Sequence, residues 1–515
     1  MMRAITTVAA VTTLSLVLFS EAANALNRVI RDCSDPFGND SCLSGSFVSF
    51  YNYNFGRREG DPPRGPNPMP APFFGSTDVD DAYDMVPFIA AYWMETFGRD
   101  GANNLGGTGD GINKPFDETQ VFVHTDGNSN IAPTCAPNGG GASANEFGIQ
   151  FCTGQATNPD LIGHEYAHLV ALYRSVNPLT GTPSPLIYED EPGALNESFA
   201  DLMGEAFERY RTGSNDWLVK PSPPLNLLRS LSNPPSLSNN VAGTPNPDRF
   251  HDPNCYCGEA DHGGVHTNST IPSKAAYLFV EGGSFNGWSL TGVSFTAMEQ
   301  VWYRALNEYY SNTETFNQAY LHLRQAARDL YGANSLELSQ LTMALRAVEL
   351  DQPGFCSGLP LRRWGDFDQN DLYTLSDSDA LVAAINTSST DLAFDINGDD
   401  LVTAADYLTW RGLAAYFTLG PGLSYLAGDA DLDGDVDGRD FLLWQRQFGT
   451  QVVPYSGADA NGDGWIDDND LVDWRQNYGL SSTITATVSV PEPATLAMLL
   501  PLLLLCWRRS KKDIQ

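Results

Sequence analysis

Two histidines spaced by four residues, with a glutamate between them, are the residues of this chain best suited to chemistry: His164, Glu165 and His168. In an α-helix, positions i and i+4 lie on the same face, so both imidazoles can reach one metal ion. Glu165 then lies to the side, where it can hold a metal-bound water without binding the metal itself. Taken alone, the pattern also fits a helix whose histidines happen to have this spacing, so its neighbours decide the interpretation.

The residues around this pattern predict the helix that it needs. Asn158, Pro159 and Asp160 supply a capping residue, a proline at the first helical position and an acid in the first turn. Leucine, isoleucine and valine side chains between positions 161 and 172 give the segment an apolar body. The sequence therefore predicts a helix that begins at about residue 159 and carries both histidines on one face.

A second predicted helix can supply the third metal ligand. Glu197 and Asp201 share a helix face because they are also four residues apart. A catalytic zinc needs three protein ligands and leaves its fourth position to water, so Glu197 can complete the set. Asp201 can accept the spare N–H of a ligating histidine. The alternative is an acidic, solvated helix face, but Phe199, Leu202 and Phe207 make this helix largely apolar.

A third segment adds another imidazole. It begins at Asp261, continues through Gly263 and Gly264, and reaches His266 just before a predicted helix. The glycine pair allows the backbone to bend closely there. A lone histidine is usually structural, but His266 follows two segments that already predict a metal site.

In this order, the HExxH, GxxNExxxD and DxGGVHxNS segments resemble the thermolysin-like zinc metallopeptidases. The resemblance implies an α+β fold over residues 78–355, with a curtailed β-rich N-terminal part and an α-helical C-terminal part. It implies one catalytic Zn²⁺ and the hydrolysis of a protein or peptide substrate through a zinc-bound water. It also implies these roles: zinc ligands His164, His168 and Glu197; general base Glu165; oxyanion stabilisers His266 and Tyr188; orienting residues Asp201 (for His164) and Asp261 (for His266); and Arg229 on the substrate carbonyl.

Several positions extend or depart from this family pattern. Leu161 and Leu228 match pocket-wall positions, which favours an apolar residue after the scissile bond. The family's asparagine on its substrate-aligning edge strand falls near Gly141, which favours an alternative: a catalytically silent surface protein that binds or adheres through its acidic repeats. Residues 26–77 have no counterpart in the family and are expected to form an N-terminal extension. Three acids match family calcium ligands and predict one Ca²⁺ in the peptidase domain: Asp160, Glu208 and Asp216.

Residues 360–480 contain a repeated acidic loop that resembles dockerin-type calcium modules. Loops 429–440 and 459–470 place oxygen ligands at positions 1, 3, 5, 9 and 12, with glycine at position 6. Loop 395–406 is a copy without that glycine, and 366–370 begins a degenerate copy. A disordered acidic linker is the alternative, but regularly placed Leu and Trp argue for a mostly helical domain that binds at least two Ca²⁺ and offers a surface to a cohesin-like partner. The candidate ligands are Asp429, Asp431, Asp433, Asp435, Asp437, Asp440, Asp459, Asn461, Asp463, Trp465, Asp467, Asp470, Asp395, Asn397, Asp399 and Asp406.

The two ends of the chain predict export. Residues 1–25 combine Arg3, an apolar run and an Ala-x-Ala site, as in a signal peptide cleaved after Ala25. After a linker at 481–490, residues 491–515 begin with Pro-Glu-Pro, continue through an apolar run and end in basic residues. This arrangement resembles a PEP-CTERM sorting signal, which implies an exosortase-type processing enzyme. A transmembrane tail anchor is the alternative. We therefore expect the protein in the cell envelope or outside the cell.

Composition narrows the possible partners. The chain has 515 residues, enough for two or three domains, with 29 basic and 63 acidic residues and a net charge of −34. Such acidity argues against nucleic acid and anionic membranes as partners. Export permits disulfides, and spacing favours the pairs Cys33 with Cys42 and Cys135 with Cys152. The pairing among Cys255, Cys257 and Cys356 is left open.

Overall fold

The computed structural model describes residues 27–33, 57–66, 76–108, 118–124, 141–145, 148–174, 185–220, 228–239, 241–359, 363–370 and 372–482. Its described residues form two compact units. One contains the residues up to 370 together with 383–413, and the other contains 372–382 and 414–482. The predicted signal peptide and sorting segment lie outside the described residues, as do Cys42 and Cys135.

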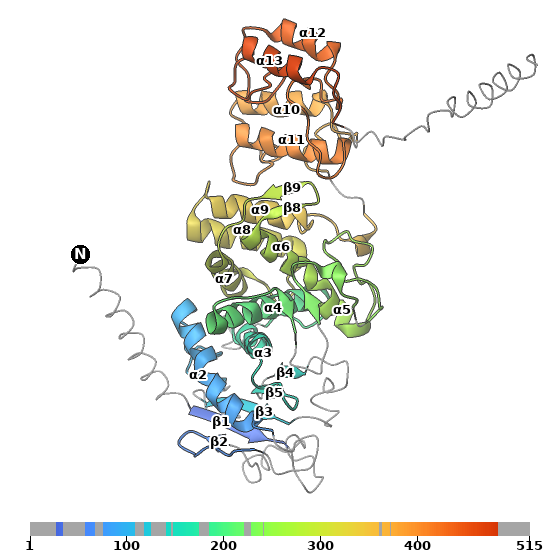
Figure 1. Cartoon of the computed structure of the whole chain (residues 1–515). Helices are drawn as coiled ribbons and strands as arrows, with labels where there is room; N and C mark the ends of the chain where they lie inside the picture. Colours follow the sequence, from blue (N-terminus) through green and yellow to red (C-terminus); the bar gives the residue numbers. More distant parts are fainter. Residues whose placement is uncertain are drawn as a thin grey trace, which may run out of the picture. The chain divides into compact units, whose positions relative to one another are not determined.

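A five-stranded mixed sheet lies at the N-terminal end of the first unit, with strand order β2-β1-β3-β5-β4 (Figure 1). β1 is parallel to β3 and β3 to β5, whereas β4 and β2 are antiparallel to their neighbours. β4 stands last in the order, so one of its edges has no strand beside it in this sheet. The strands are β1 (Asn27–Asp32), β2 (Arg57–Arg58), β3 (Glu118–Val123), β4 (Ala142–Asn145) and β5 (Gly148–Phe151).

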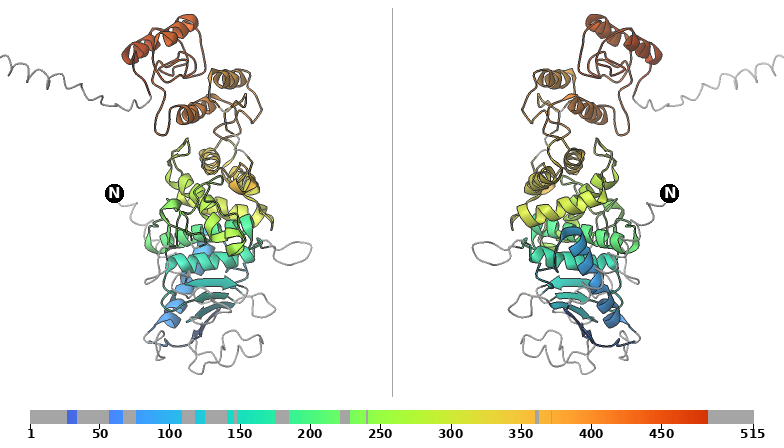
Figure 2. Two further views of the ribbon diagram at one scale, coloured as in Figure 1. Left: turned by 90° about the vertical axis from the view of Figure 1, so that its right-hand side faces the viewer. Right: turned by 90° about the vertical axis from the view of Figure 1, so that its left-hand side faces the viewer.

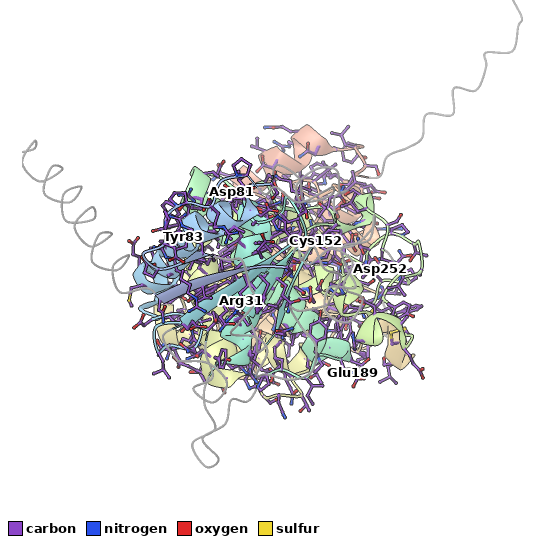
Figure 3. The ribbon with its side chains drawn as sticks, turned by 90° about the horizontal axis from the view of Figure 1, so that it is seen from below. Arg31, Asp81, Tyr83, Cys152, Glu189 and Asp252 are labelled. Atoms are coloured by element: carbon purple, nitrogen blue, oxygen red, sulfur yellow. A yellow bond between two sulfur atoms is a disulfide. The ribbon has the colours of Figure 1, made fainter. Side chains whose placement is uncertain are left out.

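The sheet includes part of the predicted N-terminal extension. β1 pairs with β3 along its whole length, and helix α2 (Asp78–Phe97) packs against both strands. The guanidinium groups of Arg28 and Arg57 each lie 3.7 Å from the ring centre of Tyr83 on α2. Seen from below, Tyr83 lies beside the strands and Arg31 over them (Figure 3). Strands from the predicted N-terminal extension, residues 26–77, therefore belong to the same sheet as strands that follow residue 78.

The two helices of the predicted metal site cross at a pair of glycines. α3 (Pro159–Leu172) packs on β4 and on α4 (Asp190–Thr212), as Figures 1 and 2 show. A Cβ atom on Gly163 would lie 2.8 Å from Cα of Gly204, too close for the helices to keep their spacing. All residues of α4 from 193 to 207 are buried, so this helix is the core of the unit.

The remaining elements of the first unit up to residue 359 include four helices that pack on α4. Short strand pairs flank the helices, and α8 and α9 close the C-terminal end of the helical part. The elements are β6 (Leu218–Val219), β7 (Arg229–Ser230), η1 (Pro234–Ser236), α5 (Ala260–Asn268), α6 (Thr270–Glu281), β8 (Gly283–Phe285), β9 (Trp288–Leu290), α7 (Phe295–Arg304), η2 (Ala305–Tyr309), α8 (Phe316–Tyr331), α9 (Leu336–Ala347) and η3 (Phe355–Ser357).

Each acidic loop from residue 395 onward is followed by a helix, as predicted. Loop 395–406 runs into α11 (Ala404–Thr418), loop 429–440 into α12 (Gly438–Gln447) and loop 459–470 into α13 (Asp468–Asn477), while α10 (Leu375–Asn386) precedes them. The last two copies brace each other: Trp444 Nε1 donates to the carbonyl of Asp467, and Trp474 Nε1 donates to that of Asp437, each at 2.8 Å. This exchange explains why these two copies carry tryptophan at the same position.

Two further expectations concern cysteines and the membrane. Cys257 and Cys356 form a disulfide with Cα atoms 5.5 Å apart, and Cys255 is a buried free thiol. The sequence had left this pairing open. Within the part of the chain that the structure describes, no helix is long and apolar enough to cross a membrane. The apolar segment 494–507 lies outside that part.

Candidate active site

The helix α3 brings the two histidines of the HExxH segment together. It begins as predicted, with Oδ1 of Asn158 accepting from the backbone N–H of Asp160 at 3.0 Å and Pro159 in the first turn. One turn apart on the same face, the Nε2 atoms of His164 and His168 lie 3.0 Å from each other. Two imidazole lone pairs at this distance repel unless a cation lies between them, which fits a shared metal ion.

Glu197 on α4 supplies the third donor. Its carboxylate oxygens lie 3.3 Å from Nε2 of His168 and 3.6 Å from Nε2 of His164. Glu197 is only 1% exposed, so its charge has almost no water around it. Burial opposes ionisation, yet His266 and His168 hold the pKa of this carboxyl well below its usual value. Two imidazoles and one ionised carboxylate are the donor set that zinc accepts at catalytic sites.

Side-chain oxygens of α4 lie behind the two histidines, next to the Nδ1 atom of each ring. Oδ1 of Asp201 lies 2.9 Å from Nδ1 of His164, the position expected from the sequence. Oδ1 of Asn196 lies 2.8 Å from Nδ1 of His168. Each partner directs the opposite ring nitrogen, Nε2, toward Glu197. Asn196 was not among the residues predicted from the sequence. Its place immediately before Glu197 on the same helix was the available signal.

Arg229 neutralises the acids beneath the histidines. Its Nε and Nη2 atoms donate to the two oxygens of Asp201 at 2.7 and 2.6 Å, and Nη2 also lies 3.4 Å from Glu197. Burial would raise the pKa of Asp201, but Arg229 and His164 keep it below its usual value. Arg229 was expected on a substrate carbonyl. The structure shows it in a bidentate pair with a buried carboxylate, and its side chain is 8% exposed.

A left-handed turn positions His266. Four consecutive residues from Asp261 to Gly264 have φ between 52° and 83°, which is unusual for the non-glycine residues Asp261 and His262. The turn folds Asp261 back so that its Oδ1 lies 2.7 Å from Nδ1 of His266 while Oδ2 accepts from the His266 backbone N–H. A side chain on Gly263 would collide with the carboxylate of Asp190, so the glycine there is required by packing as well as by φ.

Tyr188 completes the group around Glu197. Its hydroxyl donates to Oε1 of Glu197 and lies 3.4 Å from Nε2 of His266, which is itself 3.4 Å from the same carboxylate oxygen. The ring of His262 lies edge-on to Tyr188, with centres 5.5 Å apart. The two residues predicted to stabilise an oxyanion are therefore adjacent, and both lie beside the carboxylate of Glu197.

These residues open into a cavity of about 440 Å³ whose wall includes the whole of strand β4. Glu165 lines it and is 5% exposed. Burial raises the pKa of the Glu165 carboxyl, although His164 and His168 oppose that rise. Gly141, which directly precedes β4, has a φ of 81°, and its carbonyl accepts from the backbone N–H of Cys152, which directly follows β5. The cavity therefore joins a potential base, a potential metal site and a strand edge that an extended peptide could pair with.

A separate acidic cluster lies behind α3. Both carboxylate oxygens of Asp160 are buried without a hydrogen-bond partner, and burial and Glu208 raise its pKa to about 7. Oxygens of Glu205, Glu208 and Asp216 lie within 4.8 Å of one another. Orphaned buried carboxylates of this kind fit a bound cation. Glu205 was not predicted, although it lies on the same face of α4 as Glu208. The ammonium of Lys220 contacts Asp216 and Glu208. It occupies part of this cluster, so fewer cations can bind here than among the carboxylates alone.

The acidic loops hold their carboxylates in the predicted order. In loop 429–440, oxygens of Asp429, Asp431 and Asp433 converge, and Asp429 and Asp431 each keep one buried oxygen without a partner. In loop 459–470, Asp459 accepts from the backbone N–H groups of Gly462 and Gly464. In both loops the acid at position 12 caps the loop from the following helix and accepts from the residues at positions 2 and 3.

Comparison with known proteins agrees with this geometry. Residues 184–350 match the family model described as thermolysin metallopeptidase, alpha-helical domain. Bacillolysin from Bacillus cereus is 33% identical over 269 residues, which cover 50% of this chain and 41% of that protein. Thermolysin from Alicyclobacillus acidocaldarius is 33% identical over 290 residues, covering 54% and 46%. Neutral protease B from Bacillus subtilis is 37% identical over 189 residues, covering 37% and 32%.

A solved structure, the precursor of protealysin, a metalloproteinase from Serratia proteamaculans, matches with a TM-score of 0.44 and 21% identity, over 63% of this chain and 88% of that one. This chain spans less than half the length of the curated relatives it matches. The residues 184–350 that match this family model include Glu197, Arg229 and His266.

Proposed function

We propose that this chain is an exported, zinc-dependent endopeptidase of the thermolysin type. The observation that carries the proposal is the convergence of His164, His168 and Glu197 beside Glu165 in the wall of a cavity that an extended peptide can enter. Zinc held by these three residues would polarise the substrate carbonyl and activate a water for attack. Relatives named thermolysin and bacillolysin support the same reaction class.

The roles of the surrounding residues follow from their positions. Glu165 is the general base: it takes a proton from the attacking water and delivers it to the leaving amine. Its buried position raises its pKa, which favours holding that proton between the two steps. Tyr188 and His266 stand beside Glu197 and can donate to the oxyanion of the tetrahedral intermediate. Such a donor typically contributes about 3–4 kcal/mol. Asp201, Asn196 and Asp261 orient the three imidazoles.

Substrate alignment is assigned to the open edge of β4. An extended peptide added to this edge would lie along the cavity wall, with its backbone rather than its side chains giving the register. Gly141 offers no side chain for alignment, so we assign that task to the backbone of Ala142–Asn145. The preference for an apolar residue after the scissile bond is retained as part of the proposal.

Calcium is proposed as a structural ion in both units. In the first unit Asp160, Glu205, Glu208 and Asp216 are its proposed ligands, with one ion. In the second unit, loops 429–440 and 459–470 each bind one ion, and the helices that follow them offer a surface to a cohesin-like partner. The signal peptide and the PEP-CTERM-like segment give export to the envelope or beyond, with processing by an exosortase-type enzyme. Orphaned oxygens on Asp160, Asp429 and Asp431 support the calcium assignments.

The decisive experiment is peptide hydrolysis by the purified protein and by Glu165→Gln. With zinc and calcium present we expect turnover of casein and of peptides with an apolar residue after the cleaved bond, and loss of turnover in a zinc chelator. Glu165→Gln should lower kcat by a factor on the order of 10²–10⁴ while zinc remains bound at one ion per chain. Glu308→Gln, a change of the same kind in an exposed ion pair with Arg304, is the matched control. Full activity of Glu165→Gln would refute the mechanism, and a chain that binds zinc without hydrolysing any peptide would support the silent binding protein instead.

A further inference from the structure

The loop 395–406 lies against the helical end of the first unit. Arg346 of α9 is 4% exposed, and its Nη1 donates to the carbonyls of Asp395 at 2.9 Å and Ile396 at 2.7 Å. The same guanidinium lies 3.7 Å from the ring centre of Trp364, in the segment that follows the helical part. The buried guanidinium of Arg346 in the first unit therefore contacts both the segment around Trp364 and an acidic loop that the sequence assigns to a separate module.

Two further hydrogen bonds join this loop to hydroxyl groups of α9. The carbonyl of Gly398 accepts from the hydroxyl of Thr342 at 3.1 Å, and that of Asn397 accepts from Ser339 at 3.3 Å. A Cβ atom on Gly398 would collide with the Thr342 side chain. The absence of a side chain at this position therefore lets the loop approach the helix closely.

Asp400 is the most informative residue of the loop. It occupies position 6, where loops 429–440 and 459–470 have Gly434 and Gly464, and its φ is 68°. An aspartate is less stable than glycine in this conformation, so local geometry does not explain its presence. Its side chain does: Oδ1 accepts from Arg324 Nη2 at 2.9 Å, and Oδ2 accepts from Arg328 Nε and Nη2 at 3.0 and 2.6 Å.

The docking contacts and the interior of the loop use different atoms. The arginines, Thr342 and Ser339 bind backbone carbonyls of residues 395–398 and the side chain of Asp400. The carboxylates of Asp395 and Asp406 instead accept from backbone N–H groups inside the loop. The loop therefore keeps its internal fold while its outer side serves as an interface.

We propose that loop 395–406 is a docking element of the first unit: Asp400 anchors this acidic loop to α8 and α9, and the loop closes the end of the helical part. The stability of that part then depends on a repeat that lies beyond the boundary expected at residue 355. This role is independent of peptide hydrolysis, and a chain without any catalytic activity would still show it.

The test compares Asp400→Gly with Asp400→Asn and Asn334→Gly. All three are made in the full chain carrying Glu165→Gln, so that self-cleavage cannot interfere, in one calcium-containing buffer. Asn334 has a φ of 66° and lies exposed after α8, so Asn334→Gly reports the effect of glycine in this backbone conformation without arginine contacts. The measurements are amide hydrogen exchange of residues 395–406 and of α8 and α9, together with thermal unfolding.

Docking predicts that Asp400→Gly raises exchange in the loop by about tenfold or more and lowers the unfolding temperature of the first unit by about 3 °C or more. Asp400→Asn should shift both in the same direction, because asparagine tolerates the backbone but lacks the charge. Arg328→Ala should add little to Asp400→Gly, since Asp400→Gly already removes the contact between Arg328 and the loop. The proposal is overturned if Asp400→Gly stabilises the protein or leaves both readouts unchanged, as Asn334→Gly should.

Discussion

The histidine cluster on α3 and α4 and the acidic loop 429–440 both bury carboxylates, but they balance that charge differently. Around Glu197 and Asp201, the protein itself supplies Arg229 and the three imidazoles, and the pKa of both acids is held below its usual value despite burial. In loop 429–440 burial, together with Asp440 and Asp433, raises the pKa of Asp429 to about 7. Its Oδ1 also has no hydrogen-bond partner.

This difference separates a site that is organised before its ion arrives from one that the ion must complete. Glu197 and Asp201 each lie beside Arg229 and at least one imidazole, so the protein itself holds these two carboxylates ionised and in place. Loop 429–440 has like charges close together, with backbone N–H groups as its main internal donors. The cluster of Asp160 and Glu205 in the first unit resembles the loop, since both oxygens of Asp160 and one oxygen of Glu205 are buried without a hydrogen-bond partner.

The largest expected effect is the removal of calcium from the second unit. With free calcium at about a thousand times its Kd, each occupied loop would stabilise the folded state by about 4 kcal/mol, and two loops by about twice that. Titration of the chain with a calcium chelator should therefore lower the unfolding temperature of residues 414–482 sharply, as followed by circular dichroism. Calorimetry should show heat for at least two ions.

Asp429→Asn sharpens this experiment because its effect should change sign. In chelator the variant should be more stable than the parent, since it removes a buried charge that Asp440 and Asp433 repel. In calcium it should be less stable, since a ligand is weakened. Equal destabilisation in both buffers would show that Asp429 serves packing rather than cation binding.

Arg229→Met should turn the histidine cluster into a site that, like loop 429–440, needs its ion to balance buried carboxylates. The guanidinium pairs bidentately with Asp201 and contacts Glu197, and the acids are 1% exposed, so its loss leaves two buried carboxylates with less counter-charge. Breaking a buried pair from one side costs about 3–5 kcal/mol. We expect a matching loss in denaturant unfolding, partly restored by zinc. Arg249→Met, at a guanidinium whose side chain is 35% exposed, is the control. A neutral Arg229→Met would contradict the electrostatic account.

The sequence predicted what is local to a helix and missed what depends on how helices cross. Caps and four-residue spacing predicted α3 and the shared faces of His164 with His168, because both follow from helix geometry. Asn196 and Glu205 needed the crossing of α3 and α4 at Gly163 and Gly204, which periodicity does not reveal. The pairing of β1 with β3 joins residues about ninety positions apart, and so the extension was not assigned to the sheet.

Loop 395–406 shows a different limit. From its sequence this loop is predicted to be a degenerate calcium loop, because position 6 carries aspartate where the pattern has glycine. Only the positions of Arg324 and Arg328 on α8 show that the aspartate there makes contacts that glycine could not make. A departure from a motif can therefore indicate a second role. That role can be recognised only when the surface that the residue contacts is known.

The smallest expected effect concerns His124, a buried imidazole that balances acids without any metal. Its Nδ1 lies 2.7 Å from Asp32 and its Nε2 lies 3.3 Å from Asp78. Burial would lower its pKa, but these carboxylates raise it to about 9. A raised pKa means that the pairing stabilises the fold fully below the ordinary value of about 6.5 and loses that contribution as the pH rises through about 9. We expect His124→Asn, whose side chain also tolerates the positive φ of 58°, to cost on the order of 2 kcal/mol at pH 6 and much less at pH 9.5. Denaturant unfolding at both pH values measures this. A cost that does not change with pH would mean that His124 acts through packing alone, and the contrast between self-balanced and ion-dependent carboxylates would then not extend to the sheet.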